Sequence, residues 1–81
     1  MPAPSIKVLL VEDNLIDQMA FERFVRAEAL PYAYRIATSC AEARQLLHIM
    51  SFDVAILDHC LDDGTAFELR AGCPDLPIII T

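Results

Sequence analysis

Short runs of β-branched apolar residues, spaced along the chain, constrain its fold more than any other feature of the sequence. The three strongest runs are Ile6–Val11, broken only by Lys7, then Val54–Leu57 and Ile78–Ile80. Their apolar residues are continuous rather than alternating, which is typical of strands buried on both faces of a parallel sheet. A weaker run at residues 34–38 carries a charged arginine, and we predict that it forms a strand at the edge of that sheet.

Helical patterns lie between these runs. Asn14 is a good N-cap for a first helix, Asp17 falls in its first turn, where a negative charge favours the helix dipole, and Pro31 marks its end. Apolar residues spaced three or four apart are predicted to turn that helix toward the sheet: Ile16, Ala20, Phe24 and Ala27.

Two further helices are expected. Ser39 followed by Glu42 is a capping box, and the residues behind it form one apolar helix face: Ala43, Leu46, Leu47 and Met50. A shorter third helix is predicted to begin near Thr65 and to end by Gly72, with Phe67 and Leu69 turned inward.

The expected strand ends recur at a regular interval. They fall at Asp13, Thr38, Asp58 and Thr81, which are 25, 20 and 23 residues apart. Each interval holds one helix and one strand, so the units are βα repeats with right-handed crossovers. The sequence therefore predicts an α/β fold: a doubly wound parallel sheet of four strands between two helical layers, in the order β-α-β-α-β-α-β.

Composition excludes several classes of function. Twelve acidic residues against six Lys and Arg give a net charge of −6 over 81 residues, which argues against direct binding to nucleic acid or to an anionic membrane surface. Residues 1–5 resemble no secretory signal and are expected to form a disordered lead-in. The cysteines are odd in number, which favours a reducing, cytoplasmic location: Cys40, Cys60 and Cys73.

Oxygen-bearing side chains mark the carboxyl ends of the expected strands. Glu12 and Asp13 follow the first strand, Asp58 the third and Thr81 the fourth. The carboxyl ends of parallel strands meet at one edge of a sheet, so we expect these groups to converge. Neighbouring carboxylates repel one another unless a cation lies among them, and Mg²⁺ prefers such oxygen ligands. The sequence predicts a magnesium site.

Four segments together resemble a known family. KVLLVEDN at 7–14, DVAILD at 53–58, LDDGTAFEL at 61–69 and PDLPIIIT at 74–81 are similar to segments of bacterial response-regulator receiver domains. The resemblance covers residues 6–81, about two thirds of a receiver from its amino-terminal end, and implies a flavodoxin-like sheet. It also implies a phosphoacceptor module of two-component signal transduction rather than an enzyme acting on other molecules.

The resemblance assigns roles by position. It implies that Asp58 accepts a phosphoryl group from a histidine kinase or a phosphotransfer protein. Glu12, Asp13, Asp58 and the backbone carbonyl of Cys60 would then hold Mg²⁺, and Thr81 would contact the phosphoryl group and switch a partner surface.

The chain departs from the family pattern in two respects. Asp62 stands where receivers commonly have proline, and the family continues with a fourth helix, a fifth strand bearing an essential lysine, and a fifth helix. Lys7, the only lysine here, is expected away from the site. We therefore expect a piece of a longer parent that can include an output domain. Such a piece would be a poor phosphoacceptor by itself, and its exposed fourth strand could pair with another copy.

Other functions remain as alternatives. A receiver-like scaffold that binds partners without being phosphorylated is the main one, because the family's lysine is missing. A Mg²⁺-dependent phosphatase or nuclease would usually need a D-x-D pair at a strand end, which neither strand offers. A flavin or nucleotide site is disfavoured because the first loop, at residues 12–14, is acidic and lacks glycine.

Overall fold

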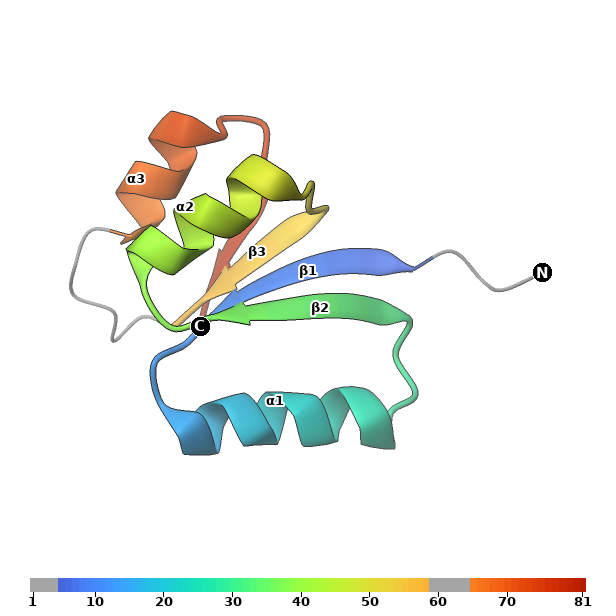
Figure 1. The fold of residues 1–81 in the computed structure, drawn as a ribbon. Coiled ribbons are helices and arrows are strands. Elements are labelled where there is room, and N and C mark those ends of the chain that lie inside the picture. The colour runs from blue at the N-terminus through green and yellow to red at the C-terminus, as the bar shows by residue number, and fades with distance from the viewer. Residues whose placement is uncertain (1–4, 59–64) are drawn as a thin grey trace.

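The computed structural model describes residues 5–58 and 65–81. Strands and helices alternate strictly along these residues (Figure 1). Their bounds are β1 Ile6–Val11, α1 Leu15–Ala27, β2 Tyr32–Ala37, α2 Cys40–Ile49, β3 Val54–Leu57, α3 Thr65–Gly72 and β4 Ile78–Ile80. The predicted order of elements is confirmed. The predicted lead-in falls on residues 1–5, of which only Ser5 is described, and Cys60 and Asp62 also lie outside the described residues.

The four strands form one parallel sheet in the order β2-β1-β3-β4. Val11, the last residue of β1, is in register with Ala37 on one side and with Leu57 on the other. Leu57 is in turn in register with Ile80 of β4. The carboxyl ends of all four strands therefore lie in line at one edge of the sheet, as the α/β prediction required.

Helices cover both faces of the sheet, with α1 on one side and α2 and α3 on the other (Figure 1). The main hydrophobic core lies under α2 and α3, where alternate residues of the central strands meet the two helices. Its buried members are Leu9, Val11, Ala37, Ala43, Ala55, Leu57 and Leu69. The apolar face predicted for the second helix is confirmed for Ala43, which is fully buried, and for Leu46 and Leu47, which pack against the core. Met50, predicted as its fourth member, is the C-cap that follows α2.

The N-cap residues predicted for the first two helices are confirmed. The Asn14 side chain accepts hydrogen bonds from the backbone N–H groups of Ile16 and Asp17 at the start of α1, and Ser39 accepts one from Glu42 at the start of α2. Just after α1, Ala29 has a positive φ of 49°. This left-handed conformation is unfavourable for a residue with a Cβ atom.

The edge strand begins earlier than the sequence indicated. β2 starts at Tyr32 and ends at Ala37, whereas the apolar run predicted residues 34–38. The shift follows from the ladder, because the N–H of Ile6 donates to the carbonyl of Pro31 at 2.8 Å and Tyr32 is already in register with Ile6. The prediction that this strand lies at an edge is confirmed.

The prediction for the face of α1 is wrong. Ile16 and Phe24, expected to face the sheet, are 76% and 57% exposed, and Ala20 and Ala27 are exposed with them. Val25 is the residue of α1 that is buried.

Aromatic and polar contacts explain this orientation of α1. The ring of Phe21 packs edge-on against that of Tyr34 on β2, with centroids 5.3 Å apart, and the Tyr34 hydroxyl donates to Glu22 at 3.1 Å. Gln18 donates to the backbone carbonyl of Glu12 at 2.7 Å. The contact face of α1 is thus partly polar, so the most apolar stripe of the helix does not identify it.

Helix α3 differs from its prediction in one residue. Leu69 is 1% exposed and joins the core, as expected, but Phe67 is 80% exposed. The two residues are about 200° apart around a helix of 3.6 residues per turn, so both cannot face the sheet.

Among the described residues, no helix combines the length and apolar character needed to cross a membrane.

Candidate functional site at the carboxyl ends of the strands

The strand order defines where a ligand would bind. From β1, the chain first adds β2 on one side and then crosses to add β3 on the other side. The connections that follow β1 and β3 therefore run in opposite directions across the sheet. In open α/β sheets, the loops diverge at such a point and leave a crevice at the carboxyl ends of the strands. Glu12 follows β1 directly and Asp58 follows β3, so both carboxylates stand at this point.

Backbone hydrogen bonds hold the first residue after β1, after β3 and after β4 in the sheet. The N–H of Glu12 donates to Ala37 at 2.9 Å, that of Asp58 to Val11 at 3.3 Å, and that of Thr81 to Leu57 at 2.9 Å. The ladder thus continues for one residue beyond the ends of β1, β3 and β4. Glu12, Asp58 and Thr81 start from backbone positions that the sheet itself fixes.

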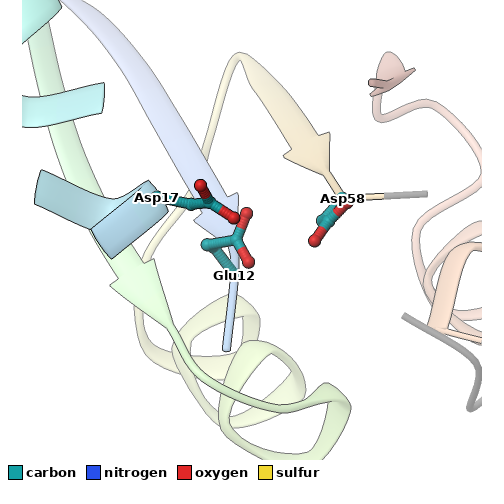
Figure 2. A group of neighbouring side chains, drawn as sticks. All are labelled: Glu12, Asp17 and Asp58. Atoms are coloured by element: carbon teal, nitrogen blue, oxygen red, sulfur yellow. The ribbon is translucent and has the colours of Figure 1, made fainter. Parts of the chain in front are cut away.

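A third carboxylate reaches the site from the first turn of α1. Ligand oxygens of Glu12, Asp17 and Asp58 all lie within 4.8 Å of one another. Glu12 is buried, Asp58 half-buried and Asp17 exposed, so the group runs from the sheet outward to solvent. Figure 2 shows the carboxylates of Asp17 and Glu12 side by side, with that of Asp58 opposite them at the end of β3.

The loop between β1 and α1 positions these groups relative to one another. Asn14 donates its backbone N–H to Glu12 Oε2 at 3.2 Å, and its side chain accepts from the backbone N–H of Asp17 at 3.2 Å. Gln18, one residue further, donates to the backbone carbonyl of Glu12. The first turn of α1 is therefore tied to Glu12 by three hydrogen bonds, two through Asn14 and one through Gln18.

Burial raises the pKa of Glu12 above its usual 4.5. The residue is only 7% exposed, and desolvation disfavours the charged form of its carboxyl group. The hydrogen bond from the Asn14 backbone acts in the opposite direction, whereas the negative charge of Asp58, a hydrogen bond shared with that group and the charge of Asp17 all raise the pKa further. Among the described residues, the charges that act on the Glu12 carboxyl group are therefore negative ones.

The donor set fits a hard divalent cation. All three members are carboxylates, and Mg²⁺ binds oxygen at about 2.0–2.1 Å, so opposite ligand atoms of one ion are about 4.2 Å apart. The mutual spacing of at most 4.8 Å accommodates such an ion, held directly or through one of the waters it keeps. A divalent ion would also offset the repulsion that raises the pKa of Glu12.

The sequence-predicted site residues fall into three groups. Glu12 and Asp58 are brought together as expected. Thr81 follows β4, the neighbour of β3, and its hydroxyl donates to the carbonyl of Leu57 at 3.4 Å. Asp13 is exposed and is not a member of the carboxylate group, so its role as a ligand stays a prediction. Cys60 lies outside the described residues.

Sequence reasoning gave Asp17 only a role in the helix dipole. A signal for its position was present: the helix capped by Asn14 begins directly after the loop that carries Glu12. The first turn of such a helix lies at the same edge of the sheet as the strand ends, which brings its side chains over the site.

Lys7 lies at the opposite end of β1 from Glu12, and its backbone N–H donates to the Asp53 side chain at 2.8 Å.

Solved structures resemble this fold closely, although no family model and no curated protein sequence matches the chain. A response regulator receiver protein from Pseudomonas putida is 23% identical, with a TM-score of 0.79 over 99% of this chain and 69% of its own. The MaeR response regulator bound to beryllium trifluoride is 21% identical, with a TM-score of 0.79 over 94% of this chain and 66% of its own.

A third solved structure contains a metal ion. The receiver domain of a sensor histidine kinase from Pseudomonas aeruginosa PAO1, with a magnesium ion in its active-site cleft, is 24% identical. Its TM-score is 0.78 over 95% of this chain and 66% of its own. The chain thus has the flavodoxin-like fold of response-regulator receivers, and it spans about two thirds of the length of these structures.

Proposed function

We propose that this chain is a phosphoacceptor receiver module of two-component signal transduction, in which Asp58 receives a phosphoryl group in the presence of Mg²⁺. One observation carries the proposal: in a receiver fold, the carboxylates of Glu12 and Asp58 stand within 4.8 Å of each other at the switch point of the sheet. Glu12 and Asp13, with the backbone carbonyl of Cys60, complete the proposed cation site.

The chemistry assigns a distinct part to each residue. An oxygen of Asp58 attacks phosphorus, the O–P bond forms, and the bond to the donor nitrogen or oxygen breaks. Phosphoryl transfer chiefly requires positioning and charge neutralisation, and a bound Mg²⁺ supplies the second. Glu12 is suited to hold the ion because its backbone is fixed to β2 and its carboxylate is oriented by Asn14.

Thr81 is the proposed switch. Its backbone is fixed to Leu57 at 2.9 Å, so a response to phosphorylation would come from its side chain. The hydroxyl's bond to the Leu57 carbonyl, at 3.4 Å, is longer than the usual 2.5–3.0 Å for an O–H···O bond. Replacing this hydrogen bond by one from the Thr81 hydroxyl to a phosphoryl oxygen would therefore cost little free energy. The new position of the Thr81 side chain would then shift a partner-binding surface toward its active conformation. The phosphoryl donor would be a histidine kinase or a phosphotransfer protein.

The proposal is tested by chemical phosphorylation. The chain is incubated with Mg²⁺ and acetyl phosphate, and intact mass with peptide mapping locates any phosphoryl group. We expect uptake at Asp58, at low yield, that is lost in Asp58→Asn and kept in the control Asp75→Asn, which removes the same charge from an exposed position away from the site. Uptake that persists in Asp58→Asn, or that maps to another residue, would refute the assignment.

An unphosphorylated interaction scaffold is the second candidate. Lys7, the only lysine, lies at the far end of β1, so among the described residues no lysine stands at the site to stabilise a phosphoryl group. Beryllofluoride with Mg²⁺ separates the two functions, because it mimics a phosphoryl group on the acceptor carboxylate. A phosphoacceptor is expected to show amide NMR shifts at Asp58 and Thr81, whereas a scaffold of this kind would show none.

A further inference from the structure

We propose that Asp17 is an additional carboxylate of the cation site, supplied by helix α1 rather than by a strand end, and that it strengthens divalent cation binding. The inference rests on the proposed function, because it concerns the ion that the receiver site would hold. It assigns to Asp17 a role separate from those of Glu12 and Asp58, which follow β1 and β3 directly.

The first argument is geometric. Asp17 is in the first turn of α1, where a carboxylate can serve the helix by interacting with the helix dipole alone. Its ligand oxygen nevertheless lies within 4.8 Å of those of both Glu12 and Asp58, and Figure 2 shows its carboxylate beside that of Glu12. The side chain therefore faces the same space as the two strand-end carboxylates.

The second argument concerns the waters that the ion keeps. Mg²⁺ gives up its waters reluctantly and retains several of them when protein carboxylates bind it, so a further carboxylate can act on the ion through a bound water. Glu12 is buried and Asp58 half-buried, whereas Asp17 is exposed on the solvent side of the group. Asp17 is thus placed where the ion would keep its waters, and it can contact the ion directly or accept a hydrogen bond from a bound water. Either contact adds one negative charge close to a divalent cation.

The third argument is that the backbone of Asp17 is held in place. Its N–H donates to the Asn14 side chain, and Asn14 donates its own N–H to Glu12. The carboxylate is therefore brought to the ion without ordering a flexible segment, so little conformational entropy opposes its contribution. The same connection means that cation binding is expected to affect the first turn of α1 directly.

The test measures Mg²⁺ binding itself. Isothermal titration calorimetry on the chain at constant ionic strength compares wild type, Asp17→Asn, Asp17→Glu and the control Glu28→Gln. Glu28 is exposed at the opposite end of α1, so its variant changes the net charge by the same amount far from the site. Because one charge near a divalent ion at an exposed position is worth about a tenfold change in affinity, we expect Asp17→Asn to weaken binding about tenfold. Glu28→Gln should change it less than about twofold.

A second readout follows the helix. In wild type, Mg²⁺ should shift the amide NMR signals of residues 15–18, and these shifts should shrink in Asp17→Asn. Asp17→Glu keeps the charge and should recover part of the affinity. Circular dichroism in EDTA tests whether each variant folds. If Asp17→Asn does not fold, the Mg²⁺ affinities of Asp17→Glu and wild type are compared, because the longer side chain of glutamate moves the carboxylate relative to the ion.

The outcomes separate this inference from the proposed function. If Asp17→Asn and Asp17→Glu both bind Mg²⁺ like wild type while Asp58→Asn loses binding, Asp17 has no part in the site and the proposed cation site stands. If wild type itself shows no Mg²⁺ binding, the cation site of the proposed function fails, and the inference about Asp17 fails with it.

Discussion

The opposite environments of Phe67 and Leu69 give a direct test of how α3 packs. Leu69 is 1% exposed and belongs to the core, whereas Phe67 on the same helix is 80% exposed. Truncating each to alanine should therefore have very different costs, although phenylalanine is the larger side chain. An inward orientation of both residues, as the sequence suggested, would predict the reverse order.

The expected costs follow from burial. Leu69→Ala removes three buried carbons, worth about 2.4 kcal/mol at about 0.8 kcal/mol each, and leaves a cavity that brings the loss to about 2.5–4 kcal/mol. Phe67 buries about one fifth of roughly 200 Å², worth about 1 kcal/mol at 25 cal/mol per Å². Alanine recovers about 0.5 kcal/mol of helix propensity, so Phe67→Ala should cost about 0.5 kcal/mol.

Urea unfolding followed by circular dichroism at a fixed pH measures both free energies of unfolding. A chain of this size is expected to be stable by about 4–12 kcal/mol, so Leu69→Ala can leave too little stability to measure. Leu69→Met, expected to cost less than about 1.5 kcal/mol, serves as the milder variant. The reasoning is refuted if Phe67→Ala costs as much as Leu69→Ala.

Three further predictions follow from other sites. The raised pKa of Glu12 means that the folded chain holds a proton on this group more tightly than the unfolded chain does. The protonated Glu12 therefore contributes fully to stability below pH 4.5, and this contribution is lost as the pH rises through the folded-state pKa. Urea titrations in EDTA at several pH values should show this loss of stability, and Glu12→Gln should reduce the loss. Ala29→Gly should raise the free energy of unfolding by about 0.5–1 kcal/mol, since φ is 49° there, and an unchanged or lower urea midpoint would contradict this. Asn14→Ala should cost about 1 kcal/mol through loss of the cap on α1, visible as a lower thermal midpoint, with Glu28→Gln as the neutral comparison.

The order of elements could be predicted from the sequence because three of the four strands are continuous or nearly continuous apolar runs, although only β1 has a run of four consecutive buried residues. A continuous apolar run such as Val54–Leu57 fits few other structures, and the caps Asn14 and Ser39 begin helices through local hydrogen bonds that depend on nearby residues alone. The meeting of Glu12 and Asp58 followed from the parallel sheet, which places successive strand ends at one edge.

Side-chain orientation on the helices could not be predicted in the same way. The most apolar stripe of α1 contains Ile16 and Phe24, yet Val25 is the buried residue of α1 and Phe21 packs on Tyr34 of β2. Hydrogen bonds of Gln18 and Glu22 also hold the helix in this orientation. Which polar group finds a partner depends on the tertiary position of β2, which periodicity does not contain. The approach of Asp17 to the site depends on the same tertiary placement of α1.

The short connection between β1 and α1 has a consequence for how this chain can vary. Only residues 12–14 join the two elements, and their hydrogen bonds join Glu12 to the start of the helix. An inserted or deleted residue there would rotate and displace the carboxylate on the helix relative to those on the strands. At the other end of α1, the turn at residues 28–31 does not position any of these three carboxylates. Changes of loop length among natural variants should therefore accumulate in that turn instead.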